Sequence, residues 1–126
     1  MAAPGSGFVP GRHPIEAIGR GGFLFAGMSH VGSVLALPSG VQAWPVADIA
    51  ALTPASLAAL LAEAEAIDFV LVGTGKSFVP LGADLRTAFS EAGLRFEAMS
   101  TSSATQTYNI LLDEGRKVAA ALIAVA

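Results

Sequence analysis

Two long apolar runs constrain the fold of this chain more than any other feature. Residues 67–72 read IDFVLV and residues 118–126 read VAAALIAVA, and neither run shows the regular polar alternation of a half-exposed strand. A strand that is apolar on both sides is buried on both faces, which is typical of a parallel sheet covered by helices. The second run has about half the length that a membrane-spanning helix needs, so it also predicts a buried strand.

Helical patterns precede and separate these strands. Thr53-Pro54 combines a capping side chain with proline at the first helical position, and an apolar face follows at Leu57, Leu60, Leu61 and Ala64. We expect a second helix over residues 83–92 that ends at Gly93, a strand over 94–99, and a third helix between the hydroxyls of residues 100–102 and Gly115. Strands that alternate with helices in this way predict a parallel or mixed sheet.

The first part of the chain has shorter apolar runs, separated by glycine pairs or by Pro-Ser-Gly. They predict antiparallel strands at residues 15–18, 22–25, 32–37 and 41–44, with residues 27–30 as the tip of one hairpin. Residues 1–14, rich in proline and glycine, predict a flexible N-terminal arm ahead of a single domain over residues 15–126. The predicted fold is an α/β three-layer sandwich: a central mixed β-sheet flanked by helices, plus an N-terminal β-meander layer.

Composition excludes several classes of function. The chain has no cysteine, which excludes disulfides and thiolate metal sites. Its seven basic residues are scattered and its net charge is −3, which disfavours nucleic-acid binding. Neither His13 nor His30 has a carboxylate at ligand spacing, so we expect no metal, and no motif predicts a cofactor. Because residues 1–12 lack the pattern of a signal peptide and no run is long enough to span a membrane, the expected location is the cytoplasm.

Residues 69–77, FVLVGTGKS, look like the start of a phosphate-binding loop. A Walker A motif needs a glycine five residues before the glycine of its Gly-Lys pair, but that position holds Val70. Pro80 also delays the helix that should begin at the lysine. Two interpretations remain open: a small anion or carbonyl held by the amides of residues 74–77 beside Lys76, or a tight exit turn that needs glycine.

A ligand pocket at this loop is one hypothesis for function. It would be an anion-binding protein or an enzyme, and the candidate ligand-binding residues are Ser33, Gly73, Thr74, Gly75, Lys76, Tyr108, Asn109 and Arg116. Convergence of Lys76 and Arg116 on one pocket would favour it. A structural hydrogen-bonding role for Asn109 is the simpler alternative. The catalytic residues of such an enzyme are not identified by any motif.

The second hypothesis is a non-enzymatic binding module. With 53% hydrophobic and 13% charged residues, the chain predicts an apolar surface that meets a protein partner, with a second copy of the chain as one candidate. Trp44 is either a core residue or an exposed anchor for association. On this hypothesis an apolar patch near Trp44 and the β-meander binds the partner.

Several short motifs in a fixed order resemble the Mth938-like domain family, which is classed as of unknown function. They are Gly32-Ser33, Gly40-Val41, Trp44, Val-Gly-Thr-Gly at residues 72–75, Thr-Tyr-Asn at 107–109, Glu-Gly-Arg at 114–116 and Ala-Ala-Leu-Ile at 120–123 in the closing strand. The resemblance covers residues 12–125. His30 stands where an aromatic residue is expected, and Lys76 falls where the family varies.

The resemblance implies a three-layer α/β fold and no catalytic residues. Mitochondrial members of this family include an assembly factor of respiratory complex I. The resemblance therefore favours the non-enzymatic hypothesis: a bacterial binding or assembly module whose partners include respiratory-complex assembly proteins.

Overall fold

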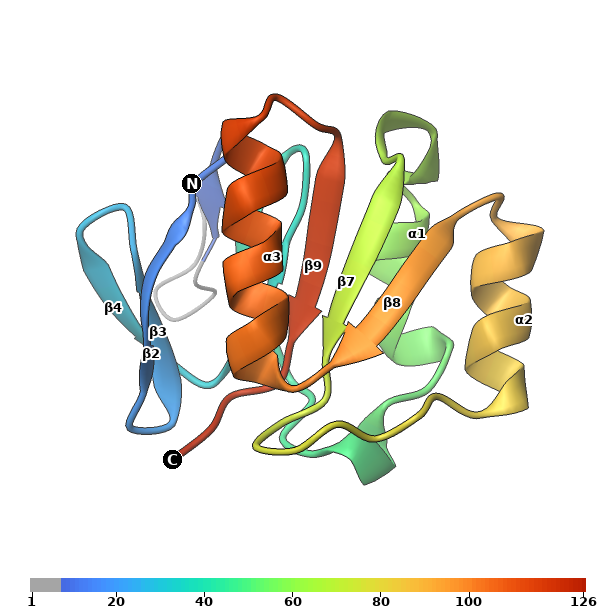
Figure 1. The fold of residues 1–126 in the computed structure, drawn as a ribbon, viewed down its shortest axis with the longest axis horizontal. Helices are drawn as coiled ribbons and strands as arrows, with labels where there is room; N and C mark the ends of the chain where they lie inside the picture. The colour runs from blue at the N-terminus through green and yellow to red at the C-terminus, as the bar shows by residue number, and fades with distance from the viewer. Residues whose placement is uncertain (1–7) are drawn as a thin grey trace.

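The computed structural model describes residues 8–126, which form three layers (Figure 1). The central layer is a six-stranded mixed sheet in the order β1 (Val9–Pro10), β6 (Gly40–Trp44), β5 (Ser33–Ala36), β9 (Val118–Leu122), β7 (Phe69–Gly73) and β8 (Arg95–Met99). Strand β7 is parallel to both β8 and β9, whereas β5 is antiparallel to β9 and β6. The α/β prediction is confirmed, and the two apolar runs form the central strands β7 and β9.

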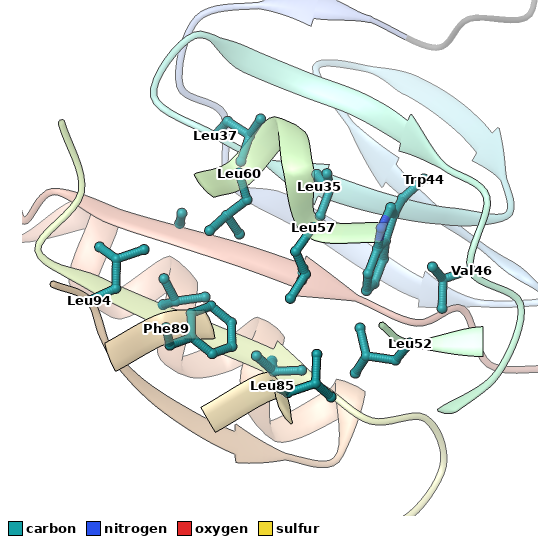
Figure 2. Close-up of a cluster of buried hydrophobic side chains, with 14 of the residues drawn as sticks. Leu35, Leu37, Trp44, Val46, Leu52, Leu57, Leu60, Leu85, Phe89 and Leu94 are labelled. Carbon is teal, nitrogen blue, oxygen red and sulfur yellow. The ribbon is translucent and has the colours of Figure 1, made fainter. Parts of the chain in front are cut away.

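The central strands divide their side chains between two cores, because successive residues of a strand point to opposite faces of the sheet. In and just after β9, Ala119, Ala121 and Ile123 join one core, shown in part in Figure 2, while Ala120 and Leu122 join the other. Both faces are therefore covered, and this explains why the run lacks polar alternation.

One face is covered by α2 (Ala83–Glu91) and by a chain of short helical turns: η1 (Ile49–Ala51), η2 (Ala55–Leu57), α1 (Ala58–Leu61) and η3 (Ala64–Ala66). Leu57, Leu60 and Phe89 are fully buried there. The prediction of a single helix after Thr53-Pro54 is therefore wrong, because this segment is a series of short helical turns. Its two fully buried leucines are three residues apart, a spacing that 3₁₀ turns present on one side as well as an α-helix does.

The other face is covered by α3 (Thr101–Asp113) and by a separate three-stranded sheet, β2 (Ile15–Gly19), β3 (Gly22–Phe25) and β4 (Met28–Val31). Figure 1 shows α3 running alongside β9, with the small sheet on the other side of the helix, and α3 contacts both β9 and β7. Two-residue turns at Arg20–Gly21 and Ala26–Gly27 connect its strands, and all four residues have positive φ, between 51° and 75°. This is the conformation of type I′ hairpin turns.

The predicted β-meander is real but is divided between two sheets. Residues 15–31 form the separate layer, whereas the predicted strands at 32–37 and 41–44 are β5 and β6 of the central sheet. The expected tip at residues 27–30 is also wrong: the tip is Ala26–Gly27, and residues 28–31 are a strand. Alanine gives no turn signal in a sequence, so nothing before Gly27 marks Ala26 as part of the turn.

The segment before β2 lies against the domain. Strand β1 pairs with β6, and the Gly11 N–H donates to the Ser39 carbonyl at 3.0 Å. Residues 9–11 of the predicted arm thus bond to β6 and to the turn before it, and residues 1–7 lie outside the described part. Among the helices of residues 8–126, none is both long and apolar enough to cross a membrane.

Candidate functional site

The loop after β7 is built around the hydroxyl of Thr74. This oxygen donates to the Ser77 carbonyl at 2.8 Å, lies 3.2 Å from the Met99 carbonyl, and accepts the Val79 N–H at 3.0 Å. Thr74 is only 5% exposed. One buried side chain therefore fixes both ends of the loop, and the loop leaves the sheet in a defined conformation.

The amides of this loop are used inside the protein. Thr74 N–H donates to the Met99 carbonyl at 2.9 Å, and Gly75 N–H donates to the Thr101 hydroxyl at 3.0 Å. A phosphate-binding loop needs successive amides that point at the ligand. The interpretation in which amides 74–77 cradle an anion is thus contradicted at its first two positions. Gly75 has φ of +107°, which agrees with the exit-turn interpretation.

The end of β7 also lies very close to the start of α3. A Cβ atom on Gly73 would lie 2.9 Å from both Cα and Oγ1 of Thr101, which is shorter than a van der Waals contact. The Thr101 hydroxyl donates to the Ile123 carbonyl at 2.7 Å, and the Thr101 N–H donates to the Gly75 carbonyl at 2.8 Å. Because the two backbones lie so close, position 73 requires glycine. Thr101 in turn connects β7, α3 and the residue after β9.

Tyr108 and Asn109 lie two turns further along α3, roughly 11 Å from Thr101 at 1.5 Å per residue. The Asn109 amide accepts the Ile15 N–H at 2.9 Å and donates to the Ile15 carbonyl at 2.7 Å. The Tyr108 hydroxyl donates to the His13 carbonyl at 3.0 Å. Burial raises the pKa of Tyr108 to about 12, partly offset by the positive charge of Arg12. Both side chains hold the N-terminal segment against α3.

Two further predicted site residues are also engaged internally. Ser33 Oγ donates to the Val46 carbonyl at 2.6 Å and accepts the Ala124 N–H at 2.9 Å. Trp44 is 4% exposed, lies in the core of Figure 2, and donates from Nε1 to the Ser56 carbonyl at 2.7 Å. Trp44 is therefore a core residue and not an exposed anchor, so a partner patch centred on it is not available.

The two predicted cations are not brought together. Lys76 is exposed in the loop after β7, at the end of the sheet where Gly73 pairs with Leu122. Arg116 is exposed just before Val118, at the opposite end of β9. The length of β9 separates them by roughly 17 Å at 3.3 Å per residue. A single pocket that uses both charges is not formed.

The structure shows two hollows beside the loop. One, of about 190 Å³, is lined by Gly75, Lys76, Ser102, Val125 and Ala126. The other, of about 400 Å³, lies beside the edge strand β8. Its apolar lining is Phe78, Pro80 and Leu81 from the loop together with Phe96 and Ala98 from β8, and its charged members are Arg86 and Glu97.

Phe78 is the residue that sequence reasoning missed at this site. It is 57% exposed at the edge of the larger hollow, directly after the loop that Thr74 fixes. The sequence does contain a signal for an exposed anchor here, because a large aromatic residue lies between Ser77 and Pro80, outside any predicted helix or strand. Thr101 follows the capping residue Ser100, so in the sequence its hydroxyl looks like one more helix cap and not like a link between strands.

Within residues 8–126, no three His, Cys, Asp or Glu side chains gather where they could hold a metal ion. One buried hydroxyl of this part, Thr105 Oγ1, has no hydrogen-bond partner. It lies one turn before Asn109, where α3 faces β2.

Comparison with known proteins places these features in a family. Residues 15–123 match the model of a protein family of unknown function, DUF498/DUF598. An uncharacterized protein of Rhodobacter capsulatus is 38% identical over 98% of this chain and 93% of its own length. The human NADH dehydrogenase [ubiquinone] 1 alpha subcomplex assembly factor 3 is 31% identical over 86% of this chain, which spans 59% of that factor's length.

Solved structures agree with the fold. An outer membrane protein from Bartonella henselae superposes with a TM-score of 0.90 at 41% identity, covering 93% of this chain and 98% of that one. A Mth938-like domain from Bordetella pertussis gives a TM-score of 0.77 at 32% identity, covering 88% and 85% of the two chains. The three-layer architecture predicted from the sequence is therefore confirmed in solved structures as well.

Proposed function

This chain belongs to the DUF498/DUF598, or Mth938-like, family of proteins of unknown function, and we propose that it is a non-enzymatic protein-binding module that assists the assembly of a larger complex. The observation that carries the proposal is the exposed Phe78 beside an apolar hollow of about 400 Å³ at the edge of the main sheet. An aromatic anchor next to an apolar centre with a few charged residues is the usual anatomy of a protein interface.

The hydrogen bonds of the predicted site residues support binding over catalysis. Three of these side chains form hydrogen bonds with backbone groups of this chain: the hydroxyls of Thr74 and Ser33 and the amide of Asn109. Such contacts fix the shape of the surface and give each of these side chains a structural role. The Thr74 contacts fix the chain immediately before Phe78, which keeps the ordering cost of binding low.

The likeness to the human assembly factor suggests the class of partner. That factor is a relative of this chain and is named for assembly of NADH dehydrogenase. We expect the partners of this chain to be respiratory-complex subunits or their assembly proteins. Because the chain spans 59% of the factor's length, the partners of the remaining part of that factor need not be shared.

Affinity purification from the native host tests the proposal. The tagged wild-type chain should recover respiratory-complex proteins, and the Phe78→Ser variant should lose them. Ile110→Ser is the matched control, because Ile110 is similarly exposed at 60% but lies on α3. Recovery of no such protein by the wild type contradicts the proposed partner class, and equal recovery by both variants contradicts the Phe78 surface.

A second candidate function is the binding of a small anion at Lys76. It is favoured by the hollow of about 190 Å³ that Lys76 shares with Ser102 at the start of α3, where helix dipoles favour negative charge. In a thermal-shift screen of anionic metabolites, Lys76→Ala should abolish any shift while Arg116→Ala, at the far end of β9, should not. Absence of any shift with the wild type removes this candidate.

The proposal places the module in the cytoplasm. The relative from Bartonella henselae is called an outer membrane protein, so the two locations should be distinguished by experiment. Fractionation of the native host should recover the chain with cytoplasmic marker proteins. Recovery with the outer membrane would contradict this part of the proposal and would require partners of a different compartment.

A further inference from the structure

The two edges of the small sheet differ in how they are closed. At the β2 edge, the side-chain amide of Asn109 binds both the N–H and the carbonyl of Ile15, as a neighbouring strand would. At the other edge, β4 is the last strand of the sheet and lies at the side of the molecule (Figure 1). Met28 is 46% exposed and Val31 is 85% exposed.

The register shows which backbone groups of β4 point outward. Phe25 and Met28 flank the two-residue turn and therefore form a hydrogen-bonded pair. Because direction alternates along an antiparallel strand, His30 also bonds to β3, whereas Ser29 and Val31 point their N–H and carbonyl groups away from it. The bond from Gly32 N–H to the Gly21 carbonyl, at 2.7 Å, continues this alternation.

We propose that β4 pairs with β4 of a second copy of this chain, antiparallel and about a two-fold axis at His30. In this register Ser29 lies opposite Val31 of the second copy, and Val31 lies opposite Ser29. Each of these pairs exchanges two backbone hydrogen bonds, so all four outward groups of each β4 are satisfied. The product is a continuous six-stranded antiparallel sheet made from the two small sheets.

The chemistry of the segment favours a second copy as the occupant. Residues 26–32, AGMSHVG, contain no carboxylate, lysine or arginine, so self-pairing places no pair of fixed like charges in contact. The edge also carries none of the lysine, proline or inward charge that edge strands use to prevent pairing. A two-fold axis at Ser29 would instead place Val31 opposite the turn residue Gly27, which cannot continue the ladder.

The outer face of the small sheet would become continuous across the new pair. A hollow of about 500 Å³ lies on this sheet, and Leu24, Ser29 and Val31 are among its lining residues. Pairing at β4 joins the two hollows side by side. This inference is independent of the proposed function, since β4 lies on the opposite side of the molecule from β8 (Figure 1), and β8 lines the hollow that includes Phe78.

Single cysteines test the register directly, because the chain has no cysteine of its own. In the proposed dimer the two His30 Cβ atoms are about 4.5–5.5 Å apart, close to the spacing of a disulfide. His30→Cys should therefore form a disulfide-linked dimer under mild oxidation. Met28→Cys should not, because its two copies are offset by four residues, or roughly 13 Å, although Met28 is well exposed.

A proline variant tests the pairing without an added thiol. Val31→Pro removes an outward N–H but no bond to β3, so the variant should keep its fold by circular dichroism and lose about tenfold or more in dimer association. Val31→Thr keeps the N–H and should dimerise in sedimentation velocity as the wild type does. A wild type that stays monomeric at the highest concentration, equal cross-linking of His30→Cys and Met28→Cys, or undiminished dimerisation of Val31→Pro would each overturn the inference.

Discussion

The side chain of Asn109 binds both backbone polar groups of Ile15, accepting from the N–H at 2.9 Å and donating to the carbonyl at 2.7 Å. These two bonds attach the small sheet to α3. Asn109→Asp keeps the acceptor but replaces the donor by a carboxylate oxygen that faces the Ile15 carbonyl. We expect a loss of about 1–3 kcal/mol in the free energy of unfolding, measured by urea denaturation.

Gln106→Glu is the control for this change. It makes the same amide-to-acid replacement at an exposed position of α3, so it should change the free energy of unfolding by no more than about 0.5 kcal/mol. Hydrogen exchange should show faster exchange of the β2 amides in Asn109→Asp alone. Equal stability of the two variants would mean that Asn109 does not hold the sheet.

The buried phenol of Tyr108 should lower the free energy of unfolding at alkaline pH. Burial raises its pKa from 10.0 to about 12, partly offset by Arg12. The unfolded chain therefore releases the phenol proton at lower pH than the folded chain does. The resulting stability is complete below pH 10 and is lost as the pH rises toward 12, by about 2–3 kcal/mol in total.

Tyr108 is the one tyrosine of the chain, so phenolate absorbance reports its titration without overlap from other tyrosines. Tyr108→Phe should remove this part of the loss between pH 10 and 12, while lysine titration remains common to both proteins. At neutral pH the variant should be less stable by about 0.5–1.5 kcal/mol, because the His13 carbonyl loses its donor. Titration of the folded wild type near pH 10 would contradict the predicted environment.

The main layers could be predicted because they follow from local patterns. The two apolar runs predicted β7 and β9 as central strands, since a strand that lacks polar alternation is covered on both faces. Gly93 and Gly115 predicted helix ends correctly, and both have positive φ. Hydroxyl groups at residues 100–102 predicted the start of α3, where Ser100 accepts the Ser103 N–H.

Tertiary contacts decided the features that the sequence did not reveal. Nothing local distinguishes β3 from β5, yet β5 joins the central sheet because it pairs with β9, far away in the chain. The same holds for the loop after β7. A threonine between two glycines suggests a ligand site, but the partners of its hydroxyl and amide include Met99, which only the fold brings near.

The Thr74 hydroxyl should control the shape of the loop that precedes Phe78. Thr74→Val keeps the side-chain volume but leaves the Val79 N–H without its acceptor and the Ser77 carbonyl without its donor. We expect a loss of about 1–3 kcal/mol in the free energy of unfolding and faster amide exchange over residues 75–79. Thr74→Ser keeps the oxygen and should retain slow exchange in the loop.

The same pair of variants connects the loop to the proposed function. If Thr74 positions Phe78 for a partner, Thr74→Val should reduce partner recovery in affinity purification and Thr74→Ser should not. Undiminished recovery by a Thr74→Val protein whose loop exchanges fast would show that partner binding does not depend on the loop. That result would leave Phe78 itself to be tested by substitution.

A substitution at Trp44 should change the stability of the protein but not its association with a partner. It is 4% exposed and donates from Nε1 to the Ser56 carbonyl at 2.7 Å. Trp44→Phe loses this bond and leaves a small cavity, so the free energy of unfolding should fall by about 1–3 kcal/mol.

Trp44 is also the one tryptophan of the chain, and its fluorescence should resist a soluble quencher until the protein unfolds. Partner recovery by the folded Trp44→Phe protein should equal that of the wild type, because the side chain is enclosed by the core. Easy quenching in the folded state would contradict the burial of Trp44. A Trp44→Phe variant of normal stability that fails to recover partners would support the interpretation of Trp44 as an exposed anchor.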